Sequence, residues 1–180
     1  MLNINFTPFP YLETERLYLR PLKTEYANEI FVLRTDESVN EFIKRPRAKT
    51  IDDALQHIEK INNNIENDES ILWAISMKND PKLIGTICLW NIVKEKDHAE
   101  IGYELLPQFN GKGLMQEAFV KVIEYGFEKL QLKTIEAWLN VNNLRSIKIL
   151  EKNNFKRDLE AENKMDKTEY TEMIIYSLTR

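Results

Sequence analysis

Glycine is rare in this chain, and it gathers where it could serve chemistry. Only 5 of the 180 residues are glycine, yet Gly102, Gly111 and Gly113 lie within twelve residues. The last two stand between a predicted strand and a helix predicted to begin at Leu114. Such a loop leaves main-chain N–H groups unpaired at a helix N-terminus, where the dipole favours an anion. The spacing predicts a phosphate or pyrophosphate site, to which Lys112 adds charge; the alternative is a loop that needs glycine only for its turns.

Two common phosphate-binding motifs do not match this loop. A P-loop continues with Lys and Ser or Thr after its second glycine, but Leu114 follows Gly113. A dinucleotide fingerprint needs a third small residue where Gln116 stands. Glu136 lies about where a ribose-binding acid would be, but the chain lacks the repeated strand–helix–strand units of that fold.

Bulk composition excludes several classes of protein. The chain has 25 basic and 29 acidic residues, a net charge of −4, so we expect no nucleic-acid partner. The longest apolar run, residues 71–75, is too short to span a membrane, and the first residues lack a secretory signal. A single cysteine, Cys88, allows no internal disulfide. We therefore expect a cytoplasmic protein with no membrane partner and, from the spacing of His, Cys and Asp, no metal.

The elements that must position the loop follow from hydrophobic periodicity and turn signals. No linker or repeat divides the chain, so we expect a single domain over residues 1–180. The predicted order is β-α-α-β-β-β-α-β-α-β-β, a mixed α+β fold. The predicted helices begin near Thr24, at Thr50, at Leu114 and near Leu144. The predicted strands are 13–20, 71–77, 82–92, 99–106, 134–141, 156–162 and 171–179.

Several segments together resemble one protein family. Gln108-x-x-Gly111-x-Gly113, preceded by the strand 100–107, resembles the acetyl-coenzyme A signature of the Gcn5-related N-acetyltransferases (GNAT), and more narrowly their RimJ/RimL-type branch. The resemblance covers about residues 12–178 and departs at Asn154, where the family has glycine; Asn tolerates the left-handed conformation such a helix end requires. Its further matches are Thr14 to Pro21, Glu117-Ala118 and Asn143-x-x-Ser146 with Phe155.

The resemblance implies a GNAT-type fold, a central twisted and mostly antiparallel sheet whose middle strands splay apart, flanked by helices. It also implies acetyl-CoA as cosubstrate, with the pyrophosphate on the loop and pantetheine along strand 99–106. A bulge near Leu105 and Leu106 would free an N–H for the thioester oxygen. Asn143 could instead be only a helix N-cap. The expected cofactor-binding residues are Leu105, Leu106, Gln108, Asn110, Gly111, Lys112, Gly113, Leu114, Met115, Asn143 and Ser146.

The implied reaction is direct attack of an amine on the thioester. Glu100 is the first candidate for the general base, ahead of Glu41 and His98, and Ser146 is the candidate acid. Glu100 could equally be a salt-bridged strand carboxylate, and Ser146 a residue that faces solvent. We expect His98 to be exposed and His57 to lie on a helix surface.

The acceptor is expected to be a primary amine, either on a protein N-terminus or on a small molecule. One is the N-terminal α-amino group of a protein, such as a ribosomal protein, whose pKa of about 8 makes deprotonation easier than for lysine. The alternatives are a small amine, amino acid or antibiotic, a different acyl group, or a non-catalytic acyl-CoA-binding module. The protein could be a monomer or a homodimer. Residues 35–50, the two early helices and the last hairpin are expected to form the acceptor pocket. Four aromatic residues could line this pocket, although packing in the core is the default expectation for each: Phe42, Trp73, Trp90 and Tyr176.

Overall fold

The centre of the fold is one mixed β-sheet, whose strands come from most of the length of the chain. The computed structural model describes residues 2, 4–166 and 170–180. In these residues eight strands form one sheet in the order β1-β2-β3-β4-β5-β6-β8-β7, and only the β5–β6 pair is parallel. The strands are β1 (Leu12–Glu13), β2 (Leu17–Arg20), β3 (Ile71–Met77), β4 (Asp80–Val93), β5 (His98–Leu105), β6 (Thr134–Asn140), β7 (Lys156–Arg157) and β8 (Met173–Thr179).

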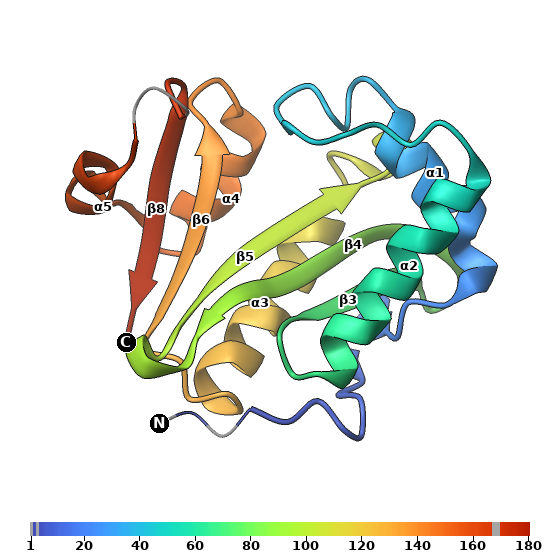
Figure 1. Ribbon diagram of the computed structural model, residues 1–180, viewed down its shortest axis with the longest axis horizontal. Coiled ribbons are helices and arrows are strands. Elements are labelled where there is room, and N and C mark those ends of the chain that lie inside the picture. The colour runs from blue at the N-terminus through green and yellow to red at the C-terminus, as the bar shows by residue number, and fades with distance from the viewer. Residues whose placement is uncertain (1, 3, 167–169) are drawn as a thin grey trace.

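Helices cover both faces of the sheet (Figure 1). One core lies under α1 and α2, and a larger core lies under α3 and α4. Among the described residues, no helix has both the length and the hydrophobicity needed to cross a membrane. The helices are α1 (Ala27–Thr35), α2 (Ile51–Glu66), α3 (Leu114–Glu128), α4 (Leu144–Lys152) and α5 (Leu159–Lys164).

The sheet splays between β5 and β6. The two strands pair only from His98 with Thr134 to Glu100 with Glu136. Beyond Glu100 they diverge, and α4 lies beside the opening (Figure 1). The predicted α+β fold with splayed middle strands is confirmed. The predicted bulge near Leu105 and Leu106 is wrong, because β5 stays in continuous register with β4 from Ile101 to Leu105.

The main error in the predicted elements lies at residues 156–162. Only Lys156–Arg157 is a strand, and α5 follows in place of the rest. Asp158 caps this helix, since its carboxylate accepts a hydrogen bond from Ala161 N at 2.9 Å. Glu162 then turns inward, accepting from Arg157 and from Ile175 N. The helix is six residues long, too short for its period to show in the sequence.

Candidate active site

The glycine loop has the conformation that its sequence predicts. Gly111 and Gly113 have φ of +76° and +75°, and Asn154 at the end of α4 has φ of +64°. Gly113 is the N-cap of α3, and no side chain caps the helix. A Cβ on Gly111 would meet nothing within 4 Å, so this side of the loop is open. The first N–H groups of α3 are thus available to an anion, which is the cradle that a pyrophosphate requires.

The C-terminal end of β5 directs main-chain groups into the splay. Leu106 N donates to Ile84 O at 2.8 Å, so the N–H of Leu106 is engaged with β4. In an antiparallel ladder the next residue points its N–H the other way, and Leu105, opposite Gly85, therefore presents its N–H to the side where β6 has diverged. The ladder alone supplies the donor for which a bulge was expected.

Gly85 allows β4 and β5 to approach closely at this point. A Cβ on Gly85 would lie 2.4 Å from Glu104 O and 3.0 Å from Leu105 Cα. Both atoms belong to the main chain and cannot move aside without moving β5. The position of the Leu105 N–H therefore depends on the absence of a side chain on the neighbouring strand.

Two cavities meet at the end of β5. One cavity, of about 320 Å³, lies among residues 38–43, β5 and the start of α4; because residues 38–43 fall within the segment expected to form the acceptor pocket, it is called the acceptor cavity. The loop cavity, of about 480 Å³, lies over the glycine loop. Both are lined by Leu105, Asn110, Met115, Arg145 and Ile149. The two cavities form one groove that leads from the helix N-terminus past the Leu105 N–H.

The groove brings most of the expected cofactor residues together. Leu106 is an exception, because it is buried in the core under α1 and α2. Gln108 and Lys112 are exposed and line neither cavity; the Lys112 ammonium lies 5.4 Å from the ring centre of Phe109. The expected residues that line the groove are Leu105, Asn110, Gly111, Gly113, Leu114, Met115, Asn143 and Ser146.

Asn143 and Ser146 meet the groove at the start of α4. Asn143 Oδ1 accepts from Ser146 N at 3.2 Å, so Asn143 is a helix N-cap as well as a residue of the acceptor cavity. The Ser146 side chain lies near the hydroxyl of Tyr103, which also lines this cavity. Burial raises the pKa of Tyr103 to about 12, although the neighbouring Ser146 hydroxyl opposes the rise. The pair therefore presents two protonated hydroxyls at the acceptor cavity.

Glu100 lies at the closed end of the splay. It pairs across the sheet with Trp90 and Glu136, is 7% exposed, and accepts a hydrogen bond from Asn91 Nδ2 at 2.5 Å. Burial raises the pKa of Glu100, opposed by the Asn91 bond. A raised pKa suits a general base, but Glu100 lines neither cavity of the groove.

His98 differs from its expected exposure, whereas His57 lies on α2 as expected and is only partly exposed. The side chain of His98 is only 15% exposed, and its Nε2 lies 3.2 Å from Glu136 Oε2. His57 is half-buried; burial, together with the charges of Arg34 and Arg45, lowers its pKa to about 4. The neutral form of His57 is therefore the one that fits the folded protein.

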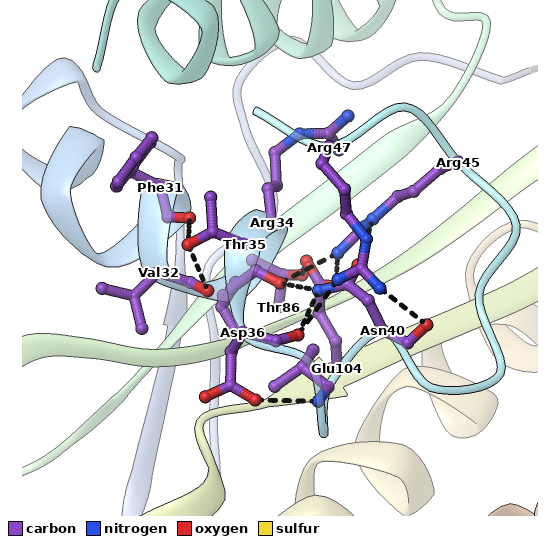
Figure 2. A network of polar contacts seen from close by, with 12 residues as sticks. Phe31, Val32, Arg34, Thr35, Asp36, Asn40, Arg45, Arg47, Thr86 and Glu104 are labelled. Carbon is purple, nitrogen blue, oxygen red and sulfur yellow. Dashed lines mark hydrogen bonds and ion pairs between the residues drawn. The ribbon is translucent and has the colours of Figure 1, made fainter. Parts of the chain in front are cut away.

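Sequence reasoning missed a polar network that holds residues 36–47 against β5 (Figure 2). Arg45 Nη2 donates to Glu104 Oε2 at 2.7 Å and its Nε donates to Asn40 Oδ1 at 2.8 Å. Thr86 Oγ1 donates to the other oxygen of Glu104 at 3.3 Å. Glu104 lines the acceptor cavity beside residues 38–43. The network thus fixes one wall of that cavity and places a carboxylate in it.

Two cations at the loop cavity were also missed. Arg145 and Lys148 both line it. Their spacing of three residues puts them on one face of α4. That spacing, which begins two residues after Asn143, is the signal that could have identified them as a basic pair at this cavity.

Two of the four aromatic residues follow the default of core packing, and two do not. Phe42 lines the acceptor cavity, whereas Trp73 is fully buried and Tyr176 is 7% exposed. Trp90 is 48% exposed, and neither cavity includes it. Glu41 does line the acceptor cavity. The described residues contain no group of three or more His, Cys, Asp or Glu side chains that could hold a metal ion.

Comparison with known proteins agrees with this geometry. The sequence model of one protein family, the acetyltransferase (GNAT) domain, matches residues 16–156 of this chain. The uncharacterized N-acetyltransferase YoaA of Bacillus subtilis (strain 168) is 31% identical over 150 residues, covering 83% of this chain and 85% of YoaA.

Solved structures share the fold at lower identity. The ribosomal L7/L12 α-N-protein acetyltransferase RimL, in complex with coenzyme A, gives a TM-score of 0.82 at 16% identity, over 94% of this chain and 98% of that one. The microcin C7 self-immunity acetyltransferase MccE, in complex with acetyl-CoA and AMP, gives a TM-score of 0.75 at 24% identity, over 92% of this chain and 93% of MccE.

A splayed sheet beside a glycine loop at a helix N-terminus defines the class of acyl-CoA-dependent N-acyltransferases. Within that class the chain belongs to the GNAT family. It is an N-acetyltransferase that uses acetyl-CoA, and the RimJ/RimL-like branch is consistent with its structural neighbours.

Proposed function

We propose that this N-acetyltransferase, acting as a single domain, acetylates the α-amino group of a protein N-terminus. The observation that carries the proposal is the continuous groove, which opens into an acceptor cavity of about 320 Å³ lined by Glu41, Glu104 and Ser146. A chain end can enter such a cavity, where the carboxylates of Glu41 and Glu104 can accept hydrogen bonds from its amino group, although Arg45 already compensates the charge of Glu104. The likeness to RimL, an α-N-protein acetyltransferase, supports this acceptor.

The donor lies along the groove in this proposal. The loop 108–115 and the start of α3 hold the pyrophosphate, with Arg145 and Lys148 on the opposite wall. The free edge of β5 holds the pantetheine as an added strand would. Acetyl-CoA supplies the thioester carbonyl, whose oxygen meets the Leu105 N–H; this N–H stabilises the negative charge that develops during attack.

The chain's own residues manage charge and protons during attack. The acceptor enters as an ammonium and first gives one proton to the base, because only the neutral amine has the lone pair that attacks. Its nitrogen then forms a bond to the carbonyl carbon, the C–S bond breaks, the nitrogen loses a second proton and the sulfur gains one. We assign binding of the acceptor ammonium to Glu104, because it lines the acceptor cavity. We keep Glu100 as the base, acting through solvent, because its pKa is raised. We assign the role of acid to Ser146, which lines the acceptor cavity beside Tyr103.

A panel of acceptors tests the proposal. Release of free thiol is followed with acetyl-CoA and peptides that have a free or a blocked N-terminus, each containing one lysine, and with small amines. We expect turnover only for peptides with a free N-terminus, with the acetyl group on the terminal nitrogen by mass spectrometry. Turnover of small amines alone would refute this acceptor, and CoA binding without any turnover would favour a binding module.

A further inference from the structure

Arg16 joins the beginning of the chain to the glycine loop. Its Nε donates to Glu117 Oε2 at 2.7 Å, and its main-chain N donates to Glu117 Oε1 at 2.8 Å. Its Nη1 donates to Lys112 O at 3.0 Å. A Cβ added to Gly113 would lie 3.6 Å from Arg16 Nη2, so the guanidinium lies against the loop itself.

The contact to Lys112 fixes the direction of the loop's main chain. Lys112 lies between the two glycines of positive φ, where the chain has the most freedom to rotate. With its carbonyl oxygen held by Arg16, that oxygen cannot turn into the site and oppose an anion. The neighbouring N–H groups then keep the orientation that an anion requires.

Arg16 also compensates the charge of Glu117. Glu117 lies in the first turn of α3, and its N–H donates to Gly113 O at 3.1 Å. Burial would raise the pKa of Glu117, but the hydrogen bonds from Thr14 and Arg16 prevail and lower it, so this carboxylate is ionised. An ionised carboxylate one turn from a pyrophosphate repels it unless a cation compensates.

We propose that Arg16 is a positioning residue for the phosphate end of the cosubstrate, holding the glycine loop through Lys112 O and neutralising Glu117. The inference rests on the proposed placement of the pyrophosphate at this loop. It also gives a joint role to two segments, Thr14 to Arg16 and Glu117, which lie about a hundred residues apart.

The first test measures direct binding of CoA by calorimetry. Arg16→Met should weaken CoA about tenfold, or about 1.4 kcal/mol. It should also speed amide hydrogen exchange in residues 109–113 of the free protein, a readout that needs no turnover. Arg20→Met is the matched control, because Arg20 lies at the far end of β2, which begins directly after Arg16, and donates to Ser76 Oγ at 2.7 Å. Its CoA affinity should equal that of the wild type.

The second test separates a local effect on phosphate from a general loss of structure. With acetyl-pantetheine, which has no pyrophosphate, Arg16→Met should keep the kcat/KM of the wild type. With acetyl-CoA, its KM should rise while kcat stays within about twofold. Equal losses with both donors, or no loss with acetyl-CoA, would overturn the inference. Failure of the wild type to bind CoA would instead refute the proposed cofactor site.

A third variant keeps the inference testable if Arg16→Met does not fold. Glu117→Gln removes the carboxylate charge and leaves the contact between Arg16 and Lys112 available. Its CoA affinity should equal or exceed that of the wild type. If Glu117→Gln weakens CoA tenfold, Arg16 does not act by compensating this charge, and the inference is wrong.

Discussion

Replacing Arg45 should loosen the wall of the acceptor cavity and destabilise the protein. The side chains of Arg45 and Glu104 are 19% and 11% exposed, so the pair lies between a surface ion pair and a fully buried one. Surface pairs contribute about 0–1 kcal/mol, and removing one partner of a buried pair costs about 3–5 kcal/mol. Because Thr86 still donates to Glu104, we expect Arg45→Met to cost about 2 kcal/mol.

The assay is urea and thermal unfolding at pH 7. For a chain of this size, about 2 kcal/mol corresponds to a fall in Tm of about 4–8 °C. Arg47→Met is the matched control: Arg47 lies on the same segment and donates to Asp36 O and Asn40 O at 3.2 and 3.4 Å. We expect it to change stability by at most about 0.5 kcal/mol. Equal effects of the two variants would refute the reasoning.

Kinetics add an independent check on Arg45. Since residues 38–43 line the acceptor cavity, the KM for the acceptor should rise in Arg45→Met. The Kd for CoA should stay that of the wild type, because no residue of the segment 36–47 lines the loop cavity. A double variant, Arg45→Met with Glu104→Leu, should recover part of the lost stability, because no uncompensated charge remains. A weaker CoA affinity in Arg45→Met would show that the segment 36–47 also supports the loop cavity, and would contradict this prediction.

Three further predictions follow from single residues. Gly85→Ala should cost about 1–3 kcal/mol in urea unfolding and reduce kcat, because the new Cβ would press on Glu104 O; wild-type values would show that the strands can separate freely. His57→Gln should reduce the loss of stability between pH 7 and pH 5. Below pH 6.5 His57 is protonated in the unfolded chain but stays neutral in the folded protein, where its pKa is about 4, so acid favours unfolding. An unchanged pH dependence of stability would exclude His57 as a cause. Glu100→Gln should lower kcat/KM and remove the fall in rate on the acid side of the wild-type profile; a profile of unchanged shape would exclude Glu100 as the base.

Local signals in the sequence predicted most of the fold. Thr50 begins α2 in a capping box with Asp53, and the glycines of the loop have the positive φ that their spacing suggested. These features depend on residues within a few positions of one another. The predicted strand 156–162 failed because α5 is stabilised mainly by contacts with β8, which lies farther along the chain.

The parts of the site that depend on distant residues could not be predicted in this way. Arg45 meets Glu104 across 59 positions, and Arg16 meets Glu117 across 101. No periodicity links such pairs, because only the packed fold brings them together. The bulge expected near Leu105 failed for a different reason: the ordinary alternation of the β-ladder already directs an N–H into the splay, so no irregularity is needed.

Strand β5 serves two ligands through different atoms in our proposal. Its main-chain edge faces the donor, and the side chain of Glu104 faces the acceptor. A change of side chain can therefore retune acceptor preference while donor recognition is inherited unchanged. This division of labour makes the strand a natural point for divergence among enzymes of this fold, and the place to begin in engineering a new acceptor.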